Sequence, residues 1–93
     1  MRLKWTQKAS RDLEAVKANL RGGDDAGAAN ATVLELIQQA GALAEHPGMG
    51  RPGRVKGTRE LAVAGHPYVV QYIHLNDTVV VLRVFCREEP AQA

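Results

Sequence analysis

The sequence has little cysteine, few aromatic residues and no long apolar run. Cys86 is the only cysteine among 93 residues, which excludes an internal disulfide and a finger-type zinc site. The longest unbroken run of strongly apolar residues is Val79–Leu82, far below the ~20 residues that a membrane-spanning helix needs. Residues 1–15 carry charges throughout, so we expect no secretory signal and a cytoplasmic protein.

The charge balance and the length limit the possible functions further. Lysine and arginine number 12 against 10 aspartates and glutamates, for a net charge of +2. Any role in binding nucleic acid would therefore depend on local clustering of cations. An apolar fraction of 45% and a charged fraction of 24% are typical of globular proteins. We expect one domain over residues 1–93, with a frayed tail over 88–93, and neither a metal nor a cofactor.

Hydrophobic periodicity predicts a strand and two helices in the first half of the chain. A short strand over Arg2–Trp5 precedes a helix whose N-cap is Thr6 and whose end is Gly22-Gly23. Asp24-Asp25 can cap a second helix, and Pro47 marks its end. The predicted apolar stripes of the two helices are Ala9, Leu13, Val16 and Leu20, then Val33, Leu36, Ile37, Ala40, Leu43 and Ala44.

The second half of the chain reads as a glycine-rich loop followed by strands. The loop spans Gly48–Thr58, and β-prone runs cover Thr58–Ala64, Tyr68–Leu75 and Thr78–Arg87. Asn76-Asp77 is a two-residue hairpin turn. The expected fold is therefore α+β, in the order β-α-α-β-β-β, with an antiparallel sheet and a helical hairpin packed on one face.

The hairpin turn predicts which side chains share a face. Uninterrupted pairing joins Tyr72 with Val81 and Tyr68 with Phe85. We expect the helices to cover the more apolar face, which carries Val69, Gln71, Ile73, Leu75, Val80, Leu82, Val84 and Cys86. The candidate functional face is then the mixed one, with His66, Tyr68, Val70, Tyr72, His74, Val79, Val81, Arg83, Phe85 and Arg87. A shift of one residue in register would exchange the two faces.

The glycine-rich loop holds a cluster of cations with no acid between them: Arg51, Arg54, Lys56 and Arg59. Such a cluster can hold phosphates or a carboxylate-rich partner, or it can be a solvated loop. Gly48–Gly53 also matches G-x-G-x-x-G, but a helix precedes it and a strand follows, so dinucleotide binding is not predicted. Cys86 is expected to be a buried, inert thiol.

Several segments, in the right order, resemble the RelE/ParE superfamily of toxins from type II toxin–antitoxin modules. In the first helix, Ala9, Asp12 and Leu13 fit the superfamily's A-x-x-D-L. The later matches are Pro47–Arg51 with P-x-M-G-R, Gly57–Leu61 with G-x-R-E-L, Pro67–Tyr72 with P-Y-x-V-x-Y, and Val79–Val84 with V-x-I-L-R-V. The resemblance runs from Trp5 to about Arg87, nearly the whole chain.

This resemblance implies a small bacterial or plasmid-borne protein that arrests growth and serves in plasmid stabilisation. A co-encoded antitoxin would neutralise it by wrapping a C-terminal segment over it, often in a hetero-oligomer. RelE-like members cleave mRNA on the ribosome, whereas ParE-like members poison DNA gyrase. The P-Y-x-V-x-Y and L-R-V patterns are more ParE-like, so gyrase is the predicted target and ribosome-dependent mRNA cleavage is the alternative.

The two activities assign different roles to the same region. For a ribonuclease, the resemblance points to Arg87, Tyr68, His66 and Arg59 as catalytic residues, although Cys86 stands where relatives have histidine. For a toxin that only binds, the candidate contacts with target or antitoxin are Arg51, Arg54, Lys56, Arg59, Arg83 and Arg87. We expect the four loop cations to meet an acidic antitoxin segment in a salt-sensitive complex.

Overall fold

A computed structural model describes residues 1–21 and 26–87 of the chain. The elements are β1 (Arg2–Trp5), α1 (Gln7–Arg21), α2 (Ala26–Gly41), the 3-10 turn η1 (Ala42–Ala44), β2 (Arg51–Pro52), β3 (Arg59–Ala62), β4 (Tyr68–Leu75) and β5 (Thr78–Cys86). The predicted order is confirmed, with one addition: the loop predicted over Gly48–Thr58 contains the short strand β2. The predicted caps at Gly22-Gly23 and Asp24-Asp25, and the tail over 88–93, lie outside the described residues.

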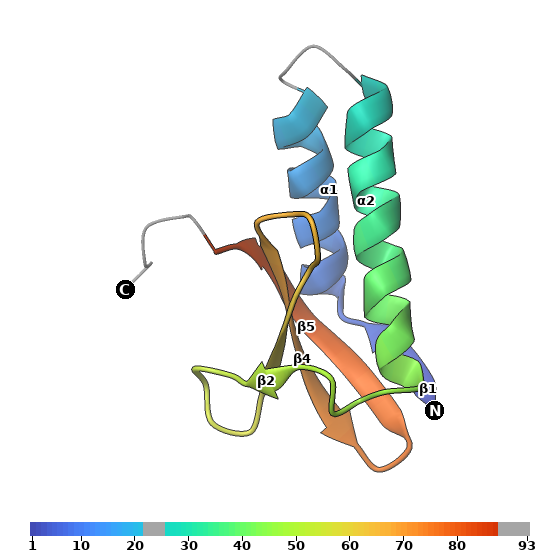
Figure 1. Cartoon of the computed structure of the whole chain (residues 1–93), viewed down its shortest axis with the longest axis vertical. Coiled ribbons are helices and arrows are strands. Elements are labelled where there is room, and N and C mark those ends of the chain that lie inside the picture. The colour runs from blue at the N-terminus through green and yellow to red at the C-terminus, as the bar shows by residue number, and fades with distance from the viewer. Residues whose placement is uncertain (22–25, 88–93) are drawn as a thin grey trace.

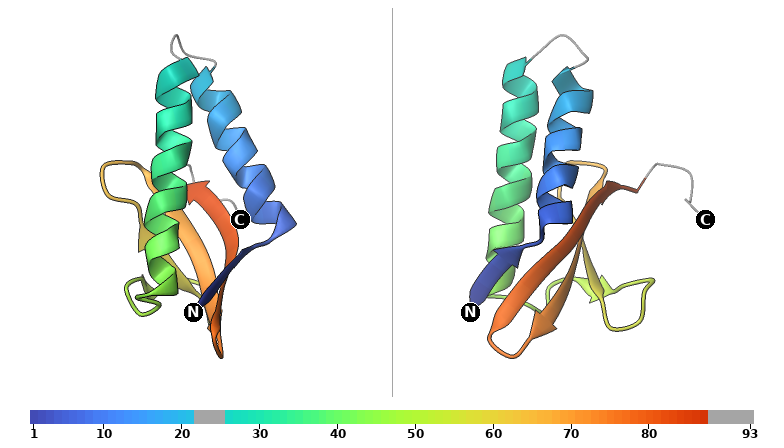
Figure 2. Two further views of the ribbon diagram at one scale, coloured as in Figure 1. Left: turned by 90° about the vertical axis from the view of Figure 1, so that its right-hand side faces the viewer. Right: turned by 180° about the vertical axis from the view of Figure 1, so that it is seen from behind.

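The molecule has two layers, a five-stranded sheet and a helical hairpin that covers one face of it (Figures 1 and 2). The strand order is β1-β5-β4-β3-β2. Strands β2 to β5 pair antiparallel in sequence order, as expected. The N-terminal strand β1 instead joins the far edge in parallel, pairing Leu3 with Val79 and Trp5 with Val81. The predicted α+β fold is therefore confirmed, and the sheet is antiparallel except at β1.

The core lies between the helical layer and one face of the sheet. Its helical side is built from Ala9, Val16, Leu36, Ala40 and Leu43, and its sheet side from Leu61, Val63, Val70, Tyr72, Val79, Val81 and Val84. Most of the predicted helical stripe is thus confirmed. Ile37 differs, because its side chain is 41% exposed, and the side chain of the predicted Leu20 lies outside the described ones.

The predicted faces of the β4–β5 hairpin are wrong over most of its length, because the helices cover the side of Val70, Tyr72, Val79 and Val81 and not the more apolar side. A β-bulge also interrupts the predicted pairing. Tyr72 pairs with Val81 as expected, but Gln71 then pairs with Arg83 and Tyr68 pairs with Cys86. One extra residue of β5, Leu82, is accommodated at this point. Each later side chain of β5 therefore lies on the opposite face from the one that uninterrupted pairing predicts.

With the bulge, the core face carries Val79 and Val81 before the irregularity and Val84 after it. The helices therefore cover the side of Val70 and Tyr72, which was predicted to be the functional face because its side chains are the more polar set. Val84 and Cys86 lie on the helical side, as predicted.

Thr6 joins the first strand, the first helix and β5. Its backbone N–H donates to the carbonyl of Val81 at 3.0 Å, which continues the parallel ladder. Its hydroxyl donates to the carbonyl of Leu82 at 3.1 Å and accepts from the N–H of Ala9 at 3.0 Å. The predicted N-cap is thereby confirmed, and the same side chain also fixes the helix against the strand edge.

We predict that Thr6→Ala lowers the free energy of unfolding by about 1–2 kcal/mol, because the cap and the bond to Leu82 are both lost. Urea-induced unfolding followed by circular dichroism measures this loss. Thr6→Ser keeps the hydroxyl and should cost well under half as much. An equal loss in both variants would show that the methyl group, not the hydroxyl, makes the contribution.

Candidate functional site

The connection from the helices to the sheet is fixed by the buried phenol of Tyr72. This side chain is fully buried. Its hydroxyl donates to the carbonyl of Pro47 at 2.7 Å and accepts from the N–H of Gly50 at 2.9 Å. The hydroxyl thereby provides partners for two backbone groups of a segment that has no regular secondary structure. Residues 47–50 are therefore held against the core of the sheet.

Arg59 holds the same segment from β3. Its Nε and one terminal nitrogen donate to the carbonyl of Gly50 at 3.1 and 2.6 Å, and that terminal nitrogen also reaches the carbonyl of Gly48 at 3.2 Å. Most of its donors are thus engaged by backbone oxygens. Arg59 was predicted as a contact or catalytic cation, and the structure places it in the support of the loop.

Glu60 binds two of the predicted loop cations, Arg51 and Arg54. Its side chain is only 3% exposed. One carboxylate oxygen accepts from the backbone N–H of Arg54 at 3.1 Å and from its Nε at 3.3 Å, and the other lies 3.9 Å from a terminal nitrogen of Arg51. A buried carboxylate needs such partners to offset its lost hydration. The guanidinium of Arg54 also lies 5.3 Å from the ring centre of Phe85.

The strand register aligns these residues across the sheet. Arg51 pairs with Glu60, Glu60 with Gln71, and Gln71 with Arg83. Because paired residues point to the same side, this row lies on the face away from the helices. We call this the outer face; it also carries Phe85, two residues beyond Arg83 on β5.

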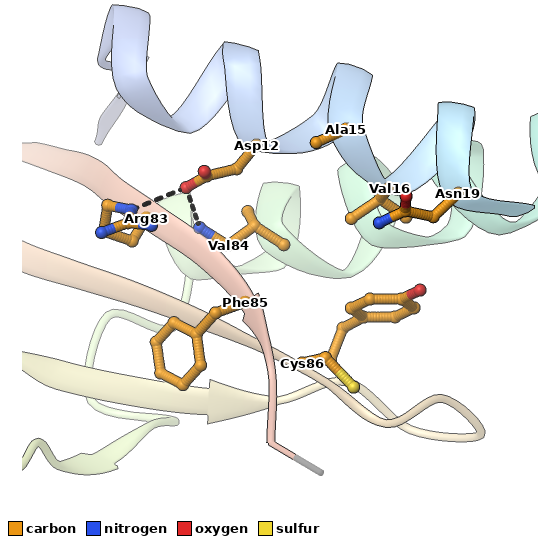
Figure 3. A pocket seen from close by; sticks show the side chains of 9 residues that line it. Asp12, Ala15, Val16, Asn19, Arg83, Val84, Phe85 and Cys86 are labelled. Carbon is orange, nitrogen blue, oxygen red and sulfur yellow. Dashed lines mark hydrogen bonds and ion pairs between the residues drawn. The ribbon is translucent and has the colours of Figure 1, made fainter. Parts of the chain in front are cut away.

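Arg83 reaches around the edge of the sheet to helix α1. Its Nε donates to Asp12 at 2.8 Å, and the same carboxylate oxygen accepts from the N–H of Val84 at 2.9 Å (Figure 3). Beyond Val81, β1 no longer pairs with β5. The Asp12 carboxylate therefore accepts the hydrogen bond from the Val84 N–H that a neighbouring strand would otherwise accept.

A pocket of about 220 Å³ opens beside this edge, between α1 and the end of β5 (Figure 3). It is lined by Asp12, Ala15, Val16, Asn19, Tyr68, Arg83, Val84, Phe85 and Cys86. Reasoning from the sequence missed this pocket, because only the bulge turns Cys86 and Tyr68 toward the helix together. Cys86 is half-buried here rather than part of the closed core.

The remaining predicted residues gather at the turn between β3 and β4. The backbone N–H of Arg87 donates to the carbonyl of Pro67 at 2.8 Å. Because Pro67 lies between His66 and Tyr68 in the sequence, this bond brings Arg87 close to both. The His66 ring pairs with the carboxylate of Glu35 on α2. The Arg87 side chain is exposed. Arg87, Tyr68 and His66 therefore share one end of the sheet, whereas Arg59 pairs with Tyr72 near the middle of β4.

No group of three or more metal-ligating side chains occurs among residues 1–21 and 26–87. Within the same residues, no helix is both long enough and apolar enough to cross a membrane. The candidate site therefore consists of cations, the backbone groups that bind them, and the pocket between α1 and the end of β5.

Comparison with known proteins gives a consistent family match. A model described as the ParE toxin of type II toxin–antitoxin system, parDE, matches residues 3–90. The protein Y4kP of Sinorhizobium fredii, whose name classes it as a candidate toxin, is 44% identical over 71 residues, which are 76% of this chain and 73% of that protein.

Solved structures show the same fold. A structure of the chromosomal ParDE toxin–antitoxin system from P. aeruginosa matches with a TM-score of 0.86 and 28% identity, covering 92% of this chain and 95% of the other. The RelBE2 toxin–antitoxin complex from Mycobacterium tuberculosis matches with a TM-score of 0.68 and 26% identity over 92% and 96% of the two chains.

We predict that Gly50→Ala lowers the free energy of unfolding by about 1–3 kcal/mol through overpacking. A Cβ at this position would lie 2.6 Å from the Tyr72 hydroxyl and 2.9 Å from the carbonyl oxygen of Glu60. Gly48→Ala is the matched control, because its Cβ would meet nothing within 4 Å. Thermal unfolding should show a lower midpoint for the first variant only. Equal midpoints would contradict the tight packing of Gly50 against Tyr72.

Proposed function

The chain belongs to the ParE toxin family of type II toxin–antitoxin systems, and from that premise we propose that it arrests growth by poisoning DNA gyrase and that a cognate antitoxin neutralises it. The gyrase assignment follows from the family resemblance. The observation that supports it over mRNA cleavage is the separation of the candidate catalytic residues.

Those residues do not all converge on one point, because Arg59 lies apart from the other three. Arg59 pairs with Tyr72, four residues along β4 from Tyr68, which corresponds to ~13 Å at the usual rise of a strand. Its guanidinium is occupied by the carbonyls of Gly48 and Gly50. Phosphoryl-transfer catalysis needs donors within hydrogen-bond distance of one scissile phosphate. A poison of another enzyme needs only a binding surface, and the exposed cations of the outer face provide one.

The edge of β5 supports the proposal that an antitoxin binds this chain. Both structural neighbours come from toxin–antitoxin systems. In this chain no described element pairs with β5 beyond Val81 on the β1 side, and the pocket lies beside that edge. An extended segment can add its backbone to such an edge and place a side chain in the pocket. The acidic antitoxin segment expected at Arg51, Arg54, Lys56 and Arg59 stays a prediction.

One observation favours the alternative function. Arg87, Tyr68 and His66 share one end of the sheet, and a tyrosine, a histidine and an arginine are groups that can move a proton and stabilise a charged transition state. A ribosome-dependent ribonuclease would have to use these three without Arg59. The two functions differ in what they require of Arg87.

We predict that the purified chain inhibits ATP-dependent plasmid supercoiling by gyrase and leaves ribosome-bound mRNA intact. Both assays are run on one preparation, and addition of the cognate antitoxin should restore supercoiling. Cleaved mRNA with normal supercoiling would replace the gyrase proposal with the ribonuclease.

Arg87→Ala separates the two mechanisms further. In a gyrase poison, binding energy is spread over a surface, and the variant should lose only a few-fold in inhibition. In a ribonuclease, removal of a transition-state cation should lower cleavage by ~10²-fold or more. Arg11→Ala, an exposed cation of α1, is the matched control and should behave as the unaltered chain in both assays.

A further inference from the structure

The outer face concentrates cations on the side of the sheet that the helices leave uncovered. Arg51 and Arg83 stand at the two ends of the paired row across β2 to β5, separated by about 14 Å at the usual spacing of strands. Arg87 follows Arg83 and Phe85 on the same side of the chain. Lys56 is exposed in the turn of residues 55–58 that closes the β2–β3 hairpin.

The acids that residues 1–21 and 26–87 place near this face are already engaged. Glu60, the one carboxylate in the row, is buried beneath Arg51 and Arg54. Asp12 is bound to Arg83 and to the N–H of Val84. The described part of this surface is therefore positive, although the net charge of the whole chain is only +2. A local field of this kind attracts polyanions whatever the net charge.

Arg54 is held in place and still open to solvent. Its Nε is bound to Glu60, its plane lies over Phe85, and its side chain is 62% exposed. The ion pair uses Nε, so the terminal nitrogens have no partner among the described residues. A guanidinium fixed in this way loses little conformational entropy when it binds a phosphate. The Arg51 side chain, at 72% exposure, is similarly accessible.

We propose that the outer face binds the phosphate backbone of duplex DNA through Arg51, Arg54, Lys56 and Arg87. Arg51 lies on β2 and Arg87 directly follows β5, so at least three strand spacings, ~14 Å, separate them, and cations this far apart can reach phosphates on either side of a major groove that is ~12 Å wide. Among the described residues, the one carboxylate of the row, Glu60, is buried, so the exposed charges of the outer face are those of arginine and lysine, as in surfaces that hold DNA without reading its sequence.

Only one step of this inference rests on the proposed function: the placement of that DNA in the complex with gyrase. A toxin that contacts both gyrase and the DNA held by it would trap the two together. Direct binding of DNA by the toxin alone can be measured without gyrase, so the two proposals can fail separately.

The test is fluorescence anisotropy of a labelled 30-base-pair duplex, titrated with the toxin over a series of salt concentrations. The double variant K56E/R87E reverses two exposed cations of the outer face that have no ion-pair partner among the described residues. K8E/R11E reverses two exposed cations of α1 and changes the net charge equally. Circular dichroism confirms that both variants are folded.

We expect K56E/R87E to weaken DNA binding by ~10-fold or more and to reduce the slope of log K against log salt by about two. K8E/R11E should change the affinity less than about threefold. Equal losses in the two variants would show a response to net charge alone and would overturn the proposal. The absence of measurable binding by the unaltered toxin at low salt would also overturn it.

Two parallel measurements distinguish the other outcomes. If K56E/R87E binds DNA normally but weakens the antitoxin complex, the outer face belongs to the antitoxin and the proposal is wrong. If the toxin binds DNA through this face but leaves supercoiling unaffected, the DNA inference stands and the gyrase proposal falls. If gyrase is poisoned equally by both variants and neither loses DNA affinity, the gyrase proposal stands and the DNA inference falls.

Discussion

The two hydrogen bonds of the Tyr72 hydroxyl are the interaction on which the rest of the site depends. The phenol is fully buried in the core between sheet and helices, and its oxygen binds Pro47 and Gly50. This places the chain that leaves the helical layer at the edge of the sheet, where Arg51 begins β2. Arg59 and Glu60 then complete the support from β3. A buried polar group of this kind is stabilising only while all its partners are present.

The motifs that identify the family are, for the most part, parts of this support. Pro47 and Gly50 bind Tyr72, Arg59 binds the loop, and Asp12 binds Arg83. These residue pairs come from separate motifs that meet in space. In this chain they hold the fold together, and their polar groups are largely engaged within it. Recognition of the family from sequence rests on these supporting residues, whereas the exposed residues Lys56 and Arg87 belong to none of these contacts.

Most of the fold could be predicted from the sequence, because helical periodicity, the Thr6 cap and the Asn76-Asp77 turn are local signals. The bulge at Gln71/Tyr72 could not be, since one extra residue in a strand leaves no mark on composition. It brought Val84 and Cys86 to the side of Val70 and Tyr72 and concealed the pocket, whereas the choice of covered face was wrong because the helices pack on the more polar side of the hairpin. The parallel pairing of β1 and the burial of Glu60 depend on contacts between distant segments, which residue patterns alone do not specify.

The pairing of β1 with β5 has a consequence for how the protein is made. The bond from Thr6 to Leu82 spans 76 positions of sequence, so one edge strand stays unpaired until nearly all described residues have been synthesised. The helical hairpin is local and can form early, whereas the sheet must close a long loop at a high entropic cost. Synthesis at ~5–20 residues per second leaves seconds between the two events. A growing chain therefore lacks its completed outer face, and the toxin becomes competent late in its own translation.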